Sequence, residues 1–195
     1  MFPLWGLMLG LVIGFLRGGR LANLSALSLR AVWLVFTGLV LQLLIFPTPW
    51  FNPLIQTGTE YFHFASYGLI ALFFIVNWRV WTLWLMALGM VLNAIVITVN
   101  GGYMPASAAA LEAAGKIEAA EQLRNATGHV YANTILMSEN TQLNFLGDWL
   151  YVPSWVPLAN AFSLGDLVLM IGIAWLIQSA MCRPASPPAD NEKQE

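Results

Sequence analysis

The stretch VWTLWLMALGMVLNAIVITVNGGYMPAS, residues 80–107, determines how this chain must fold. Its first part, Val80–Val99, has no charged side chain and reaches the roughly 20 apolar residues that a helix needs to cross a bilayer. The Asn-Gly-Gly that follows stops a helix because glycine readily adopts the left-handed conformation, and Pro105 disfavours helix at Met104. We therefore expect a membrane helix that ends in a tight turn at one face of the membrane.

The composition of the whole chain also indicates a membrane protein. Of its 195 residues, 58% are hydrophobic and only 9% are charged, whereas about a quarter of the residues in globular proteins are charged. The mean hydropathy is +0.69. The formal net charge is -2 and the eight basic residues are scattered, so the sequence lacks the basic patch of a nucleic-acid-binding protein. The single Cys182 excludes an internal disulfide.

Five apolar segments reach or approach the length of a membrane helix. They predict an all-α integral membrane bundle with spans near Phe2–Leu16, Ala31–Phe46, Phe62–Asn77, Val80–Val99 and Leu164–Met181. The transmembrane helical domain comprises residues 1–183, with an extracytoplasmic segment at about 100–163. The Pro-rich polar tail, residues 184–195, is expected to be a disordered cytoplasmic segment.

The basic residues predict the orientation of these spans. Lys and Arg concentrate in cytoplasmic loops, and six of the eight lie on one side of a five-span chain: Arg17, Arg20, Arg30, Arg79, Arg183 and Lys193. The N-terminus is then outside and the C-terminus is in the cytoplasm. The expected surroundings are the lipid bilayer of the bacterial cytoplasmic (inner) membrane.

The first span carries a stripe of glycines, Gly6, Gly10 and Gly14. Residues four apart share one helix face, and small residues there let a second helix approach closely. The partner is either another span of the same chain or a second protein, in a homo-oligomer or a larger membrane complex.

Two features are expected in the extracytoplasmic segment. SAAALEAAGKIEAAEQLRN, residues 107–125, has the apolar stripe of an amphipathic helix, with Ser107 as its N-cap. GDWLYVPSWVP, residues 147–157, is aromatic and interrupted by prolines, which favours an interfacial lid. Farther on, Ser163 and Asp166 have the spacing of a capping box directly before the last span.

A metal site is a weaker possibility. Glu60 and His63 have the Glu-x-x-His spacing of carboxylate-bridged metal sites in helical bundles, although such sites need two copies and further acids. His129 could supply another ligand beside Asp148 or Asp166. The sequence identifies no catalytic residue and no cofactor.

Several motifs occur in order along the chain: NGGYMP at residues 100–105, TQLNFLGDWLYVP at 141–153 and SLGDLVLMIGI at 163–173. With His129, they resemble an uncharacterised family of small bacterial multi-pass membrane proteins, a domain of unknown function with NGGxMP and LGD motifs. The resemblance covers nearly the whole chain up to Met181. It implies a cytoplasmic-membrane protein without an established activity.

These observations lead to three hypotheses about function. The first is a non-enzymatic accessory or small-molecule-binding subunit with a polar extracytoplasmic pocket, framed by Asn93, Asn100, Gly101, Gly102, Tyr103, Met104, Pro105, Asp148 and Asp166. The second is a membrane enzyme or metal protein that uses the His, Asp and Glu residues of the outer face. The third is a small transporter or channel, which the lack of charged residues deep in the spans disfavours.

Overall fold

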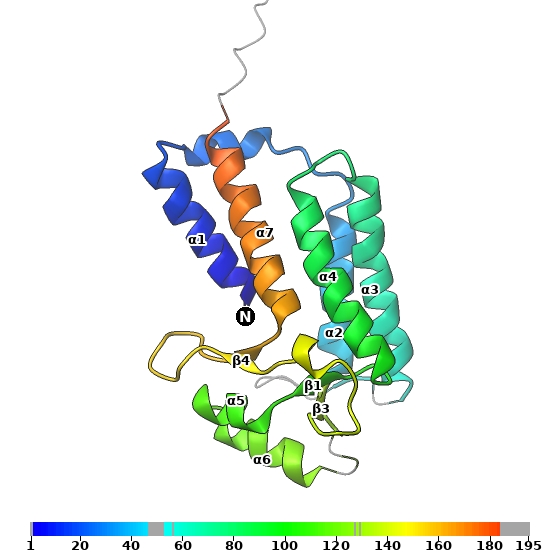
Figure 1. Cartoon of the computed structure of the whole chain (residues 1–195). Helices are drawn as coiled ribbons and strands as arrows, with labels where there is room; N and C mark the ends of the chain where they lie inside the picture. The colour runs from blue at the N-terminus through cyan, green and yellow to red at the C-terminus, as the bar shows by residue number, and fades with distance from the viewer. Residues whose placement is uncertain (1, 47–52, 56, 127, 129, 184–195) are drawn as a thin grey trace, which may run out of the picture.

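The computed structural model describes residues 2–46, 53–55, 57–126, 128 and 130–183. Within these ranges, long apolar helices stand side by side, and a layer of short helices and strands covers one end of the bundle (Figure 1). The long helices are α1 (Phe2–Leu16), α2 (Trp33–Ile45), α3 (Thr59–Val76), α4 (Leu83–Val99) and α7 (Leu164–Met181). The predicted tail, residues 184–195, lies outside the described residues.

Two of these helices, α3 and α7, are long and apolar enough to cross a membrane by length and composition. The others, α1, α2 and α4, are shorter apolar helices. The predicted bounds of α1 and α7 are confirmed, whereas α2 and α4 begin two and three residues later than predicted. α3 instead begins three residues earlier, at Thr59, directly after the left-handed Gly58.

Glycines bring the helix backbones together. The stripe Gly6, Gly10 and Gly14 lies against α7, where an added Cβ would come within 3 Å of α7 atoms. Gly89 of α4 and Gly165 of α7 face each other in the same way. The glycine stripe of α1 therefore packs against another helix of the same chain. α7 is the central helix, with α1 on one side and α4 on the other (Figure 1).

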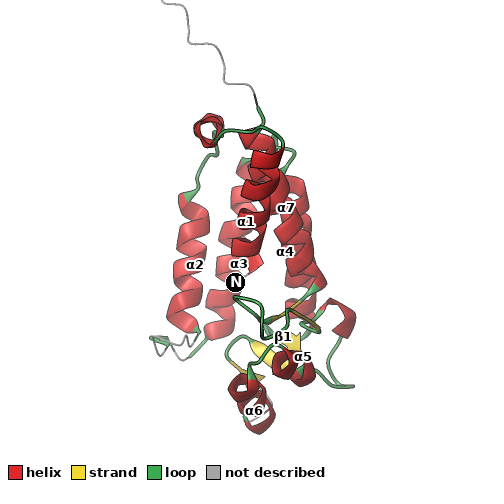
Figure 2. Cartoon of the chain, turned by 90° about the vertical axis from the view of Figure 1, so that its left-hand side faces the viewer, coloured by secondary structure: helices red, strands yellow, loops and turns green. Residues whose placement is uncertain are grey.

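The second pair of helices is α2 and α3, which pack along each other. α3 also stands beside α4 (Figure 1), whereas α2 lies at the outer edge of the bundle (Figure 2). Their tight contact includes Gly38, whose Cβ position lies 3.1 Å from the carbonyl oxygen of Ser66. Many apolar side chains on the outside of the bundle are exposed, including Phe36 at 64% and Ile75 at 65%. Such a surface suits a hydrocarbon environment.

We call residues 104–162 the end layer. Its sheet has the strand order β1-β3-β2, in which β1 (Met104–Ala106) is parallel to β3 (Thr134–Leu136), and β2 (Val130–Tyr131) is antiparallel to β3. A hairpin pairs β4 (Leu150–Tyr151) with β5 (Ala161–Phe162). The described residues also include the short 3-10 helices η3 (Asn144–Leu146), in this layer, and η1 (Leu21–Ala26), at the opposite end of the bundle. The all-α prediction therefore needs correction, because short strands build much of the end layer.

The predicted single amphipathic helix at 107–125 is wrong. The segment forms two helices, α5 (Ala108–Ala113) and α6 (Ile117–Asn125). Gly115, at φ +75°, ends α5 in a Schellman motif: its own N–H binds Glu112, and the N–H of Lys116 binds Leu111. Glu112 then forms an ion pair with Arg124 of α6. The predicted N-cap is confirmed, since Ser107 accepts a hydrogen bond from the N–H of Ala110.

Candidate functional site

A polar network links α4 to the start of α7 where the helices meet the end layer. The side-chain N–H of Asn93 donates to Asp166 at 2.8 Å, and the hydroxyl of Ser163 donates to the Asn93 carbonyl at 2.8 Å. The Ser163 hydroxyl also accepts from the Asp166 backbone N–H at 2.9 Å, so the predicted capping box is confirmed. Gly165 makes this approach possible, because its Cβ would lie 2.0 Å from the Asn93 oxygen.

A second carboxyl group, that of Asp148, is held beside this network by the end layer. The Asp148 N–H donates to the Pro105 carbonyl at 2.8 Å, and the Asp148 carbonyl accepts from the Ser107 N–H at 2.9 Å. Gly147 lies so close to β1 that a Cβ would be 2.5 Å from the Pro105 oxygen. The chain around Asp148 is thus fixed to β1 by its backbone, and the side chain is left free for another role.

The Asp148 carboxyl is unusual because one of its oxygens has no partner. Its Oδ1 is buried and has no hydrogen-bond donor among the residues that the structure describes. Burial, and secondarily the negative charge of Asp166, raise the pKa of Asp148 to about 8. At neutral pH this carboxyl therefore holds a proton, whereas an ordinary aspartate would be ionised.

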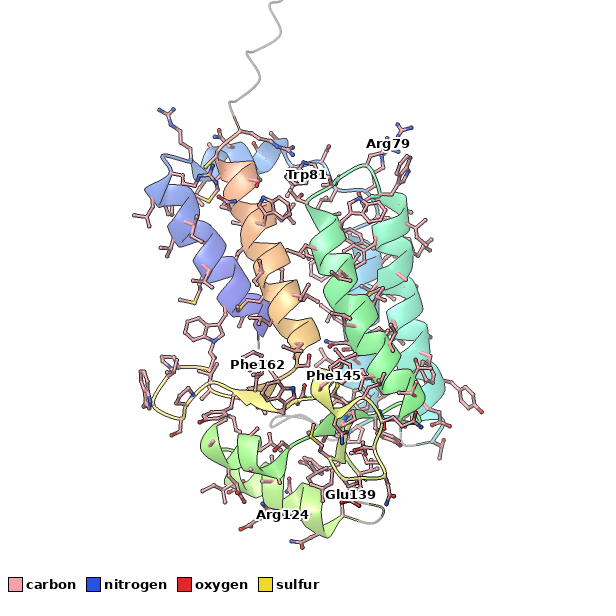
Figure 3. The ribbon with its side chains drawn as sticks, viewed as in Figure 1. Arg79, Trp81, Arg124, Glu139, Phe145 and Phe162 are labelled. Atoms are coloured by element: carbon pink, nitrogen blue, oxygen red, sulfur yellow. The ribbon has the colours of Figure 1, made fainter. Side chains whose placement is uncertain are left out.

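The two Leu-Gly-Asp triplets of the sequence meet at this place. Leu146 and Leu164 belong to one apolar cluster, which also contains Val96 and Met104. Tyr67 of α3 contacts the same cluster and lies within the electrostatic range of both aspartates. In Figure 3, Phe145 and Phe162 mark the level at which the end layer joins the helices. The site is thus a pair of carboxyl groups between an apolar cluster and the end layer.

The Asn-Gly-Gly turn ends α4 as predicted. The N–H of Gly102 binds the Ile97 carbonyl and the N–H of Gly101 binds the Thr98 carbonyl, which is again a Schellman motif. Both glycines have positive φ, +70° and +96°. The Gly102 carbonyl lies 3.1 Å from Nδ1 of His63, which carries the proton because a carbonyl only accepts. The turn is therefore tied to α3.

The structure divides the predicted pocket residues into separate groups. Asn93, Asp148 and Asp166 gather at the carboxyl pair, as described above. Asn100 instead exchanges two hydrogen bonds of 2.8 Å with the backbone of Gln142, beside a separate hollow of about 330 Å³. Met104 and Pro105 are buried in the interior, and Tyr103 is half-buried.

The predicted metal ligands are not brought together among the described residues. His63 is buried and packs edge-on against the rings of Phe46 and Tyr67. In the part of the chain that the structure describes, no three His, Cys, Asp or Glu side chains form a group that could hold a metal ion. His129 lies outside the described residues, and Glu60 remains near the start of α3.

Sequence reasoning missed two members of this site. Ser163 was expected only as a cap, yet its hydroxyl also donates to Asn93, seventy residues away in sequence. Tyr67 carries no local signal, because it is one of several aromatic residues in an apolar helix. The sequence signal for such a cluster is that polar and turn-forming residues converge on one side of an otherwise apolar bundle.

The fold and site together define a mostly helical protein with membrane-length helices and a carboxyl pair beneath a small mixed α and β layer. Residues 26–178 match DUF5317, a family of unknown function, so the chain belongs to this family. The predicted resemblance to an uncharacterised domain of unknown function is thereby confirmed. No curated protein and no solved structure matches the chain.

Proposed function

We propose that the protein is a multi-pass protein of the bacterial cytoplasmic membrane that binds a small molecule at its extracytoplasmic end. In this proposal α1, α2, α3, α4 and α7 all cross the bilayer, and the end layer lies outside. The segments at the opposite end of the bundle (Figure 1) contain five arginines, which supports a cytoplasmic position for that end: Arg17, Arg20, Arg30, Arg79 and Arg183.

The short helices are compatible with this arrangement. α2 has 13 residues, which corresponds to about 20 Å at 1.5 Å per residue. A shorter span is accommodated by local thinning of the bilayer and by flanking residues. The exposed apolar faces of these helices would then contact lipid.

The observation that carries the binding proposal is the unpartnered, buried Oδ1 of Asp148. A buried polar atom without a hydrogen-bond partner lowers the stability of the fold by about 1–3 kcal/mol. A ligand that supplies the missing partner would recover this free energy on binding. The carboxylate of the neighbouring Asp166 already accepts hydrogen bonds from Asn93 and Ser163, which hold it in place. The ligand that fits is therefore small and polar: it would exchange a hydrogen bond with the protonated carboxyl, or bring a positive charge to the ionised one.

Native mass spectrometry of the gently extracted protein, combined with metal analysis, tests this proposal. We expect a stoichiometric small molecule or ion on the wild type, and a loss of about ten-fold or more in occupancy with Asp148→Asn. Glu139→Gln is the matched control, because Glu139 is an exposed acid of the same layer (Figure 3). It should retain the wild-type occupancy.

Two results would contradict the binding proposal. One is an equal amount of bound species on Asp148→Asn and on the wild type. The other is a protein that carries no small molecule but extracts with a second protein, which would support the accessory-subunit role instead. Binding measured against pH then separates the ligand classes. A cation should bind more tightly as pH rises through about 8, where Asp148 ionises, whereas a neutral donor should not.

A further inference from the structure

An apolar groove of about 490 Å³ opens between α3 and α4, toward the end of the bundle opposite the end layer. Its walls include Phe74 and Ile75 from α3 and Trp84, Ala87 and Val91 from α4. The groove exists because α3 packs along α2 and α4 packs along α7, while α3 and α4 make few contacts with each other. From Trp84 to Val91 it follows α4 for about 10 Å.

The lining of the groove is almost entirely apolar. Asn77, the polar amide in its lining, is buried and fully engaged: its oxygen accepts from the Arg30 N–H, and its nitrogen donates to the carbonyls of Arg30 and Phe73, all at 2.8 Å. A polar ligand would therefore find no free amide group on Asn77. An aliphatic chain would lose nothing by entering.

The mouth of the groove carries positive charge. Trp84 donates from its indole N–H to the Trp78 carbonyl at 3.0 Å, which ties α4 to the end of α3. The guanidinium of Arg79 lies over the Trp78 ring at 5.3 Å and is exposed (Figure 3). Arg30 is exposed as well, and its backbone is bonded to Asn77. Among the described residues, neither arginine forms an ion pair.

We propose that this groove binds one acyl chain of an anionic phospholipid, whose phosphate group lies between Arg79 and Arg30. The inference rests on the membrane location proposed above, because a lipid is the apolar molecule that surrounds an exposed groove in a bilayer. The charge selects the headgroup: each arginine near a membrane surface contributes about 1 kcal/mol toward an anionic lipid, or about a five-fold preference. The site is separate from the carboxyl pair.

A second cluster of arginines is an alternative binding site for the anionic headgroup. Arg17, Arg20 and Arg183 surround a hollow of about 280 Å³ at the same end of the bundle, beside α1 and α7. That hollow is more polar than the groove and lies next to Asn23, whose amide donates to Met181. It could attract a phosphate group but has no comparable apolar wall for a chain. The two sites therefore make different predictions.

The test is lipid retention by native mass spectrometry, with phosphatidylglycerol and phosphatidylcholine of identical acyl chains added in equal amounts. We expect one retained lipid on the wild type, with phosphatidylglycerol preferred by about ten-fold or more. Ala87→Trp fills the groove and should abolish retention, whereas Leu88→Trp, on the exposed face outside the groove, should not. Arg30→Gln with Arg79→Gln should keep a lipid but remove the preference.

Three outcomes would overturn the proposal. The preference could survive Arg30→Gln with Arg79→Gln and disappear with Arg17→Gln and Arg20→Gln, which would place the lipid in the competing hollow. Ala87→Trp could retain the lipid as the wild type does. No lipid could be retained at all. The arginine variants change exposed side chains, so they remain informative if Ala87→Trp fails to fold. Because the groove is remote from Asp148, these results do not depend on whether a ligand occupies the carboxyl pair.

Discussion

The same three residues, Leu-Gly-Asp, occur twice in this chain and end in opposite situations. At Leu164–Asp166 the aspartate begins α7, closes a capping box and accepts a hydrogen bond from Asn93. At Leu146–Asp148 the aspartate is fixed only through its backbone, and one carboxyl oxygen has no partner. In the first triplet the carboxyl group is bound within the fold, whereas in the second one buried carboxyl oxygen has no partner among the described residues.

The largest effect should come from the glycines of the two triplets. In Gly165→Ala the new Cβ would lie 2.0 Å from the Asn93 oxygen and 2.8 Å from the Gly89 carbonyl, so α4 and α7 must separate. We expect a loss of about 3 kcal/mol in the free energy of unfolding in detergent. Gly147→Ala should cost less, because it strains a loop against one carbonyl. Gly68→Ala, inside α3 with open space around its Cβ, is the control and should cause no loss of stability; Ala is favoured over Gly in a helix by about 0.5–1 kcal/mol.

Asn93→Ala should come next in size. It leaves the Ser163 hydroxyl and one Asp166 oxygen without their side-chain partner in a buried place, which costs about 2 kcal/mol. Asn100→Ala removes a comparable pair of bonds to Gln142 at a more exposed position and should cost about half as much. Thermal unfolding of both variants in one detergent compares them. Equal losses of stability in the two variants would mean that the Asn93 network contributes no more to stability than the Asn100 bonds do.

The dependence of stability on pH tests the other triplet. The pKa of Asp148 is about 8 in the fold against an ordinary 3.8, so the folded protein binds a proton that the unfolded chain has released. This group's contribution is complete below about pH 4 and is lost as pH rises through about 8. We expect about 1.4 kcal/mol of lost stability between about pH 7 and about pH 9.

In Asp148→Asn this loss should disappear, because the amide does not titrate. Glu139→Gln should keep the wild-type slope, since it leaves the buried acid in place. An unchanged slope in Asp148→Asn would show that another group is responsible, and it would remove Asp148 from the site.

The contrast between the triplets also explains what could be predicted from the sequence. The apolar runs gave α1 and α7 their bounds, because membrane-length hydrophobicity is a local property. The capping role of Asp166 was predicted for the same reason, since Ser163 lies three residues away. The Leu-Gly-Asp motif indicates Asp148 as a candidate, but nothing near it in sequence shows that its oxygen lacks a partner.

The end layer was predicted least well, and its contacts explain why. β1 pairs with β3 across about thirty residues, from Met104 to Thr134, and each strand has only three residues. Such strands are too short for an alternating pattern to emerge. Within 107–125 the apolar stripe continues on both sides of Gly115 and favours one helix, but the left-handed conformation of Gly115 divides the segment into two.

The smallest change in stability should come from a substitution of Thr82, which tests whether an unpartnered buried oxygen by itself indicates a binding site. The Thr82 hydroxyl is also buried without a partner among the described residues, but it lies just before α4, with no second polar group of the carboxyl site nearby. Thr82→Val removes that hydroxyl at nearly constant volume and should stabilise the protein by about 1 kcal/mol. The bound species detected on the wild type should remain. Release of that species by Thr82→Val, as expected for Asp148→Asn, would contradict this expectation. The unpartnered oxygen would then not distinguish Asp148 from Thr82, and only the proximity of Asp148 to Asp166 would support the site.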